Sequence, residues 1–195
     1  MSEIKPNLVL IGGGGHCVSV IDIIENGNEY NILGILELNK TNNNILGYKI
    51  LGDDNLIPEL VNGNTYFLIT VGQLKSYSIR KNIAKTLIEN NAKLATVISS
   101  LAYVSKHAQI EEGTVIMNHA VVNAKAKIGK NCIINTKSNI EHGVSIGEFC
   151  HISTCAVVNG DSIIGSGTFI GSNATISNDI SIKENSIISA GKFIK

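Results

Sequence analysis

The chain has 195 residues, which is enough for one or two domains with a substantial core. Its 16 Lys and Arg residues balance its 16 Asp and Glu residues, and this neutrality argues against a nucleic-acid or polyanion partner. No apolar run approaches membrane-spanning length, and residues 1–6 lack the apolar core of a signal peptide, so we expect a cytoplasmic protein without a membrane partner. The four cysteines form no CxxC pair, which favours reduced thiols in the core.

In the N-terminal half, predicted strands alternate with predicted helices. An apolar run predicts a first strand at Asn7–Ile11, and helical periodicity follows from Val18 to about Glu25. Further strands are expected at Asn31–Leu36, Tyr66–Val71 and Lys93–Ile98, and helices at Asn55–Val61 and Lys75–Asn90. This alternation is typical of a small parallel α/β sheet of three or four strands, a Rossmann-like domain that we place at residues 1–95.

A glycine run, Gly12-Gly13-Gly14-Gly15-His16, follows the first predicted strand. Glycines at such a turn let main-chain N–H groups approach a phosphate at the positive end of a helix. As a dinucleotide motif the run is incomplete, because Cys17 stands where a third glycine is expected, although Glu37 is placed to hold a ribose hydroxyl. The run therefore fits a nucleotide-sugar site, a nicotinamide site or a purely structural turn.

The C-terminal half, residues 96–195, has a strict six-residue repeat. An Ile or Val occupies every sixth position from Ile98 to Ile188, sixteen positions in all, and the residue four places later is mostly small. This period fits neither a helix nor a half-buried strand, and it predicts a β-helix of triangular section with about eighteen residues per coil. Glycines directly follow several of the aliphatic residues, and we expect them to adopt positive φ; these are Gly129, Gly147, Gly165 and Gly171.

The two halves together resemble the hexapeptide-repeat sugar acetyltransferases of the NeuD/PglD family. The resemblance rests on the glycine run and on the segments Val122–Gly129, Ile134–His142 and Ile146–Ser153. It implies a left-handed parallel β-helix and a homotrimer with active sites between subunits. It also implies transfer of an acetyl group from acetyl-CoA to a nucleotide-activated amino sugar, a UDP-4-amino sugar in bacterial surface glycan biosynthesis. O-acetylation of sialic acid is the alternative reaction in the family.

The resemblance also assigns roles to individual residues. His142 falls on the catalytic base, a role that suits an imidazole because its ordinary pKa is close to neutral pH. His151, near the reactive end, and Ser172 and Ala190, on later coils, fall on positions that contact acetyl-CoA. The positions that match the nucleotide-sugar site are Gly14, Gly15, His16, Glu37 and Gly72.

Two positions depart from the family pattern. Gly143 replaces the glutamate that follows the base in the amine acetyltransferases, and Leu38 replaces a second acidic residue of the nucleotide site. Glu141 precedes His142, but adjacent side chains on a strand point to opposite faces, so it is a poor substitute. Asn135, or a group from a neighbouring subunit, is the other candidate for orienting the imidazole.

The sequence also bears on three other interpretations. A zinc hydrolase would need three histidines from stacked coils, yet no two of His107, His119, His142 and His151 differ by a multiple of eighteen, so no metal is expected. Cys155 as a covalent acyl carrier is disfavoured, because no neighbour in sequence would activate its thiolate. A structural β-helix scaffold is the non-enzymatic alternative, but this interpretation does not account for the α/β domain.

Overall fold

The computed structural model describes residues 5–38 and 43–195, and the chain divides into two compact units. The first unit comprises Met1–Gly72 and Ser78–Ala95, and the second comprises Gln73–Tyr77 and Thr96–Lys195. The short segment Gln73–Tyr77, which the sequence suggests belongs to the α/β half, is therefore part of the C-terminal unit. Its first residue, Gln73, contacts His151, one of the two histidines predicted to act in the site.

The first unit is built on a six-stranded sheet with strand order β3-β4-β2-β1-β5-β6. Its strands are β1 (Asn7–Ile11), β2 (Asn31–Leu36), β3 (Asn44–Ile45), β4 (Tyr48–Gly52), β5 (Thr65–Ile69) and β6 (Lys93–Leu94). Central β1 pairs in parallel with both β2 and β5, and four of its five residues are buried, as expected for a strand covered on both faces. The sheet is thus larger than the predicted three or four strands.

The two extra strands form a hairpin that makes the sheet mixed rather than wholly parallel. β3 and β4 pair antiparallel through a two-residue loop, Leu46-Gly47, and both loop residues have positive φ. Type I′ hairpin loops usually place Asn or Asp at the first of these positions. Leu46 is an unusual residue for positive φ, and for this reason the hairpin was not predicted from the sequence.

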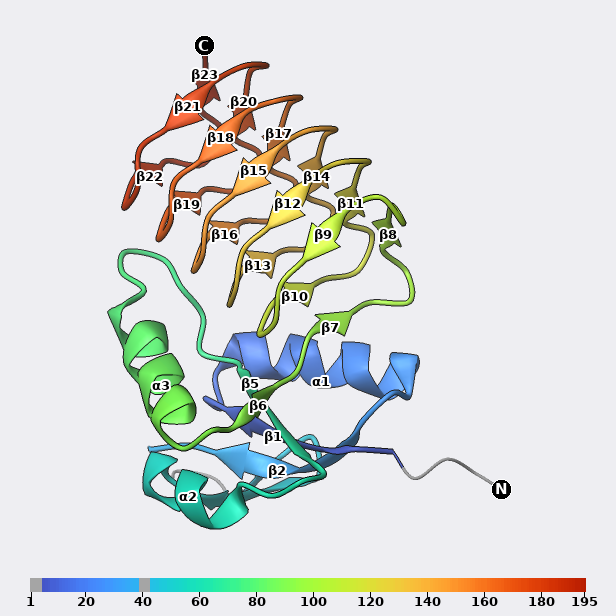
Figure 1. The fold of residues 1–195 in the computed structure, drawn as a ribbon, viewed down its shortest axis with the longest axis vertical. Helices are drawn as coiled ribbons and strands as arrows, with labels where there is room; N and C mark the ends of the chain where they lie inside the picture. Colours follow the sequence, from blue (N-terminus) through green and yellow to red (C-terminus); the bar gives the residue numbers. More distant parts are fainter. Residues whose placement is uncertain (1–4, 39–42) are drawn as a thin grey trace. The chain divides into compact units, whose positions relative to one another are not determined.

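Helices cover the sheet of the first unit. They are α1 (Gly15–Gly27), the 3₁₀ turn η1 (Asp54–Leu56), α2 (Ile57–Leu60) and α3 (Ser78–Glu89). α1 buries an apolar stripe that includes Val20, Ile21 and Ile24, and Asn28 ends it in a left-handed conformation. It begins three residues before the predicted start at Val18. Figure 1 shows α1 and α2 on opposite sides of the strands β1 and β2.

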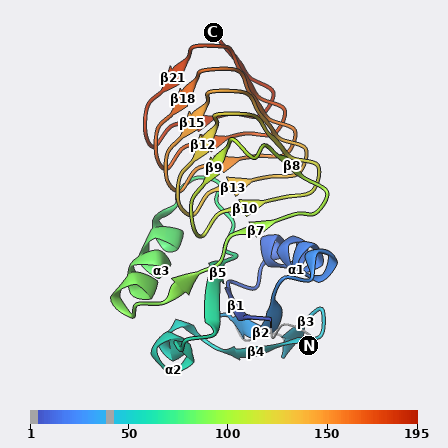
Figure 2. The ribbon, with the colours of Figure 1, turned by 45° about the vertical axis from the view of Figure 1, so that its right-hand side comes forward.

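The second unit is a β-helix of seventeen two-residue strands. They are β7 (Val97–Ile98), β8 (Tyr103–Val104), β9 (Gln109–Ile110), β10 (Val115–Ile116), β11 (Val121–Val122), β12 (Lys127–Ile128), β13 (Ile133–Ile134), β14 (Asn139–Ile140), β15 (Ser145–Ile146), β16 (His151–Ile152), β17 (Val157–Val158), β18 (Ile163–Ile164), β19 (Phe169–Ile170), β20 (Thr175–Ile176), β21 (Ser181–Ile182), β22 (Ile187–Ile188) and β23 (Phe193–Ile194). They form parallel sheets of six, six and five strands, the three sides of the prism. Figure 2 shows the coils stacked one upon another.

The register confirms the predicted coil of eighteen residues. Val115 pairs with Ile133, and Ile133 pairs with His151, so each strand stacks on the strand three hexads later. The repeated aliphatic side chains from Ile116 to Ile176 are buried inside the prism, and those of the first and last coils are partly buried. Small residues such as Ala120, Ala126 and Ser138 are fully buried beside them, as the second register predicts.

The glycines that follow the aliphatic residues do not adopt positive φ, contrary to the sequence-based expectation. Their role is steric: a Cβ at Gly129 would lie 2.8 Å from the main-chain nitrogen of Glu148, and one at Gly147 would lie 2.7 Å from that of Ser166. From Ile110 onward, the left-handed residue lies three places after each aliphatic residue instead, and most of these positions carry residues other than glycine, such as Lys137 with φ 57°. The expectation was wrong because close stacking of coils, rather than turn geometry, excludes a side chain.

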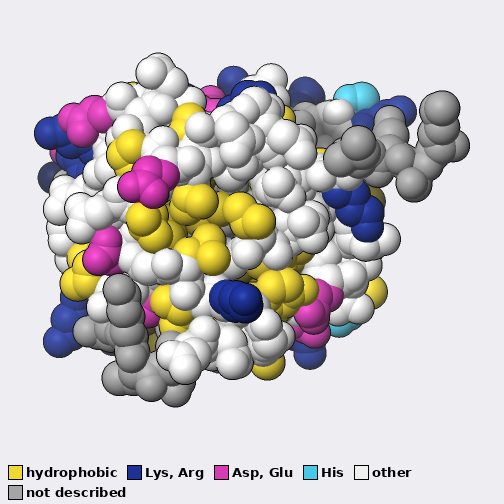
Figure 3. Space-filling model, turned by 90° about the horizontal axis from the view of Figure 1, so that it is seen from below, with side chains coloured by type: hydrophobic (Ala, Val, Ile, Leu, Met, Phe, Trp, Pro, Cys, Tyr) yellow, Lys and Arg dark blue, Asp and Glu magenta, His cyan; other side chains and the backbone are white. Residues whose placement is uncertain are grey.

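No helix within residues 5–38 and 43–195 is long and apolar enough to cross a membrane. Charged side chains on the face drawn in Figure 3 are scattered around a central group of hydrophobic side chains. Acidic and basic groups are interspersed there, in keeping with the balanced composition of the chain.

Candidate functional site

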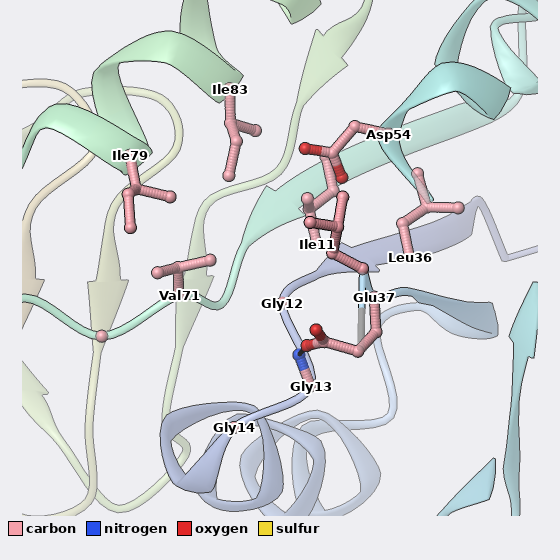
Figure 4. A pocket seen from close by; sticks show the side chains of 12 residues that line it. Ile11, Gly12, Gly13, Gly14, Leu36, Glu37, Asp54, Val71, Ile79 and Ile83 are labelled. Carbon is pink, nitrogen blue, oxygen red and sulfur yellow. Dashed lines mark hydrogen bonds between the residues drawn. The ribbon is translucent and has the colours of Figure 1, made fainter. Parts of the chain in front are cut away.

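The first unit contains a cavity of about 400 Å³ at the carboxyl ends of β1 and β5. It is lined by Ile11, Gly12, Gly13, Gly14, Leu36, Glu37, Leu38, Asp54, Val71, Gly72, Ile79 and Ile83 (Figure 4). The chain leaves β1 toward β2 on one side, whereas β5 lies on the other side of β1. Ligands of open α/β sheets bind at such a switch point, and the volume falls in the range of small-molecule sites.

The glycines of the run at this cavity differ in their surroundings. Gly12 has φ 103°, and a Cβ there would lie 2.5 Å from Cγ2 of Val71, so the fold itself requires glycine. Gly14 and Gly15 have open space where a Cβ would project. Because nothing in the protein excludes a side chain from Gly14 and Gly15, the packing of the fold requires glycine only at Gly12 among these three positions.

Two carboxylates face the cavity. Glu37, which the sequence singled out, accepts a 2.5 Å hydrogen bond from the main-chain nitrogen of Gly13 (Figure 4). Asp54, which the sequence did not single out, begins η1 in the connection between β4 and β5. Burial raises the pKa of the Asp54 carboxyl, and the nearby charges of Asp53 and Glu37 raise it further.

Three of the five residues predicted for nucleotide binding line the cavity, namely Gly14, Glu37 and Gly72. Gly15 and His16 lie just beyond the lining, in the first turn of α1. His16 lies next to Gly72, since a Cβ added at Gly72 would be 3.9 Å from the Cβ of His16. The glycine turn and the end of β5 are therefore neighbours, as the strand pairing requires.

Sequence reasoning missed a buried arginine beside this cavity. Arg80 is only 1% exposed and donates hydrogen bonds to the carbonyls of Ile69 (3.0 Å) and Val71 (2.6 Å), where β5 ends. It thereby places a positive charge beneath the chain that leads to Gly72. The only signal in the sequence was a charged residue at helical spacing from Ile83, Ala84 and Leu87, which form the buried face of α3 with Arg80.

His142 lies on an outer edge of the β-helix, two residues after the end of β14. Its side chain is 63% exposed, and its Nδ1 atom is 3.7 Å from Oδ2 of Asp161 on the following coil. The ring lies over Gly160, where a Cβ would be 2.6 Å from the ring atom Cε1. An exposed imidazole beside a carboxylate has the chemistry of a general base, because one nitrogen can be held while the other accepts a proton.

His151, by contrast, is 6% exposed and held on both ring nitrogens. Its Nδ1 donates to the carbonyl of Gln73 (2.6 Å), and its Nε2 accepts from Nδ2 of Asn135 (3.0 Å). The amide orientation of Asn135 is fixed because its oxygen accepts from the main chain of Thr136. The ring N–H is thus committed to Gln73, so the expected hydrogen bond to a thioester carbonyl requires exchange of that partner.

The two expected orienting residues have partners other than His142. Asn135 holds His151. Glu141 accepts hydrogen bonds of 2.8 Å from Asn123, one coil earlier, and from Asn139 on its own strand.

Ser172 and Ala190 occupy equivalent positions on successive coils, as their places in the repeat indicate. The main-chain nitrogen of Gly191, next to Ala190, donates to the carbonyl of Ser172 over 2.9 Å. The hydroxyl of Ser172 is 2.9 Å from that of Ser153, one coil earlier. Ala190 is exposed, and its side chain contributes no polar group. Any contact of Ala190 with a polar ligand would therefore be made by its main chain.

The sequence was compared with known families and structures. The profile of the PglD N-terminal domain matches residues 7–87, and two bacterial hexapeptide transferase profiles match residues 125–159 and 161–195. A mutant perosamine N-acetyltransferase from Caulobacter crescentus, solved with CoA and GDP-perosamine, superposes with a TM-score of 0.91 at 26% identity, covering 100% of this chain and 91% of that one. The chain therefore combines a domain of the PglD N-terminal family with hexapeptide repeats of the bacterial transferase type.

A second solved structure supports the same assignment of the PglD-type fold. The acetyltransferase domain of PglB from Neisseria gonorrhoeae, in complex with acetyl coenzyme A, has a TM-score of 0.88 at 26% identity, covering 98% of this chain and 93% of that chain. The similarity spans both units, so the prediction of a small α/β domain followed by a left-handed β-helix is confirmed. No curated protein sequence matches the chain significantly.

Within the described part of this PglD-type chain, no group of three or more His, Cys, Asp or Glu residues is arranged to hold a metal ion. The thiols of Cys17, Cys132 and Cys150 are buried and that of Cys155 is half-buried, and none of these four residues forms a disulfide bond. Burial raises the pKa of the Cys17 thiol from 9.0 to about 11.

Proposed function

We propose that the protein transfers the acetyl group of acetyl-CoA to the amino group of a nucleotide-linked amino sugar, with His142 as general base. The similar enzyme from Caulobacter crescentus is described in complex with CoA and GDP-perosamine, and the similar Neisseria domain with acetyl coenzyme A. In two of the Caulobacter structures a histidine is replaced, by asparagine in one and by alanine in the other. These likenesses support the donor, the class of acceptor and the importance of a histidine.

The observation that carries the proposal is the contrast between the two expected histidines. His151 is buried and has partners on both ring nitrogens, whereas His142 exposes 63% of its side chain at the edge of the coil. A general base must reach the proton that it removes, either directly or through one water molecule. This requirement favours His142, because its side chain is exposed whereas both ring nitrogens of His151 have partners.

The chemistry is a direct transfer. The amine nitrogen of the acceptor attacks the thioester carbonyl carbon, and a new C–N bond forms as the C–S bond breaks. His142 removes the proton that the attacking nitrogen must lose, and the imidazolium then returns a proton to the departing CoA thiolate. No acyl-enzyme intermediate is needed.

The cavity of the first unit is proposed as the nucleotide site. Gly14 and Gly72 bring the main chain close to the bound phosphates, at the N-terminus of α1. The carboxylates of Glu37 and Asp54 provide acceptors for N–H and O–H groups of the base or ribose. UDP is the nucleotide proposed from the family resemblance, and GDP is its direct competitor because a similar enzyme is described with GDP-perosamine.

A homotrimer with active sites between subunits completes the proposal. Several large apolar side chains of the β-helix are more than half exposed, namely Leu101, Tyr103, Ile163, Ile187 and Phe193. Contacts between subunits would remove such groups from water, and each would contribute to association. Light scattering coupled to gel filtration tests this, and a monomer at the concentration of the assay would contradict it.

The activity is tested by release of free CoA thiol from acetyl-CoA. The acceptor panel contains a UDP-4-amino sugar, a GDP-4-amino sugar and sialic acid, which represents the O-acetylation alternative. We expect transfer to an amino sugar, and His142→Asn to lower kcat at least about a hundredfold. His119→Asn is the matched control, an exposed histidine elsewhere on the β-helix. Acetylation of sialic acid alone, or full activity of His142→Asn, would overturn the proposal, and inactivity with all acceptors would favour a scaffold.

A further inference from the structure

The carboxylate of Asp161 lies beside the imidazole of His142. The distance between Nδ1 of His142 and Oδ2 of Asp161 is 3.7 Å. The main chain reinforces the proximity, because the nitrogen of Asp161 donates to the carbonyl of His142 over 3.0 Å. This hydrogen bond belongs to the regular stacking of coils, so the position of Asp161 relative to His142 is set by the fold.

Two glycines make room for this pair. A Cβ at Gly143 would collide with Oδ1 of Asp161, and a Cβ at Gly160 would lie 2.6 Å from the ring of His142. Gly143 thus provides the space that the carboxylate occupies, and Gly160 provides the space that the imidazole occupies. Gly143 and Asp161 also occupy the same left-handed position on successive coils, with φ 71° and 60°.

The other acidic candidate is committed elsewhere. Glu141 has both carboxylate oxygens in hydrogen bonds to side-chain amides, one to Asn123 and one to Asn139. Asn135, the remaining candidate from the sequence, holds His151. Within the described residues, Asp161 is therefore the group placed to act on Nδ1 of His142.

We propose that Asp161 is the positioning residue of His142, supplying from the following coil the carboxylate that Gly143 lacks. This inference rests on the proposed role of His142 as base. Asp161 accepts a hydrogen bond from the Nδ1–H group, which fixes the tautomer with a free lone pair on Nε2, and it stabilises the imidazolium that forms during transfer. A separation of 3.7 Å suits a pair that closes when substrates bind, since catalytic hydrogen bonds are often long in the free enzyme.

The decisive experiment compares Asp161→Asn with Asp179→Asn in steady-state kinetics. Asp179 is the matched control, because it occupies the same left-handed turn position one coil later, with φ 58°, and is likewise exposed. We expect Asp161→Asn to lower kcat by about ten- to a hundredfold with both KM values within twofold, and Asp179→Asn to stay within twofold of the parent. Asp161→Glu is expected to recover part of the lost kcat. Parental kcat in Asp161→Asn, or an equal loss in Asp179→Asn, would overturn the inference.

A double-mutant cycle separates failure of this inference from failure of the proposed function. In the His142→Asn background, Asp161→Asn should cause no further loss, because the carboxylate acts only through the imidazole. A loss in His142→Asn together with unchanged activity in Asp161→Asn would reject the role of Asp161 and leave the general base in place. Full activity in His142→Asn would instead reject the base itself.

Relocating the carboxylate provides a second, independent test. Gly143→Glu alone should lose activity, since its side chain competes with Asp161 for the same space. Gly143→Glu combined with Asp161→Gly should be at least tenfold more active than Asp161→Gly alone, because a carboxylate again lies next to His142. Circular dichroism establishes that each variant is folded. A folded double variant no more active than Asp161→Gly would contradict the inference.

Discussion

Nδ1 of His151 donates a 2.6 Å hydrogen bond to the carbonyl of Gln73, a residue 78 positions earlier in the chain. The side chain of Gln73 returns a bond of 2.8 Å to the carbonyl of Phe149. Tyr77, at the other end of the same short segment, stacks on Phe149 with ring centroids 5.6 Å apart. The segment Gln73–Tyr77 is thus held to the β-helix through one histidine, one amide and one aromatic pair.

His151→Leu is expected to destabilise the protein and release this segment. It leaves the carbonyl of Gln73 and the amide of Asn135 without a partner, at a cost of about 2–4 kcal/mol in the free energy of unfolding. Urea denaturation measures the loss, and trypsin should cut faster after the exposed Lys75. His107→Leu, at an exposed site, is the control and should change stability by about 0.5 kcal/mol or less. Unchanged cleavage at Lys75 would argue against the role assigned to His151.

Gly12→Ala and Gly14→Ala should affect different properties although they lie only two residues apart: the first should lower stability, and the second should weaken substrate binding. Alanine at position 12 requires positive φ and meets Val71, so we expect the melting temperature to fall. Alanine at position 14 has open space and an ordinary extended backbone, so the fold should be unaffected while KM for the nucleotide sugar rises about tenfold or more. Thermal melts and kinetics on both variants check this. An unchanged KM for the nucleotide sugar in Gly14→Ala would contradict the proposed role of the glycine run in binding.

Cys17 should make stability decrease in alkaline solution. Burial raises the pKa of its thiol to about 11 in the folded protein, compared with 9.0 for the unfolded chain. Between these pH values the unfolded state holds fewer protons than the folded state, so the free energy of unfolding falls as pH rises, by up to about 2 kcal/mol. Urea titrations at pH 8, 9, 10 and 11 should show a shallower decline for Cys17→Ala. Equal slopes in the two proteins would contradict this assignment.

Truncating the aliphatic stripe should cost more in the middle of the β-helix than near its end. Ile140 is fully buried, and Ile140→Ala is expected to lower the free energy of unfolding by about 2–5 kcal/mol. Ile188 is only partly buried, so Ile188→Ala should cost about 1 kcal/mol. Denaturant midpoints provide the comparison, and equal losses would show that the coils do not differ in packing.

The sequence was most informative where one residue type repeats at a fixed interval. Each aliphatic position from Ile98 to Ile188 closes one short strand, because the spacing alone sets which side chains point inward. The strands Asn7–Ile11 and Asn31–Leu36 were also predicted with their observed bounds. In both cases continuous local patterns of apolar residues carried the information.

The features that the sequence did not reveal depend on tertiary contacts or unusual local geometry. The hairpin β3–β4 was missed because Leu46 adopts a conformation typical of Asn or Gly. Asp161 was not singled out because an aspartate in a turn is ordinary, and only the stacking of coils brings it to His142. Arg80 was missed because its partners, Ile69 and Val71, are main-chain carbonyls with no signature in the sequence.

The fixed register of the coils constrains how the length of this protein can change. Insertion of one complete coil before residue 97 or after residue 176 would leave His142 and Asp161 as neighbours. The same insertion between them would add a layer of strands and separate the imidazole from the carboxylate by roughly a further 4.8 Å. The join between these two coils is therefore the place where the β-helix tolerates duplication least.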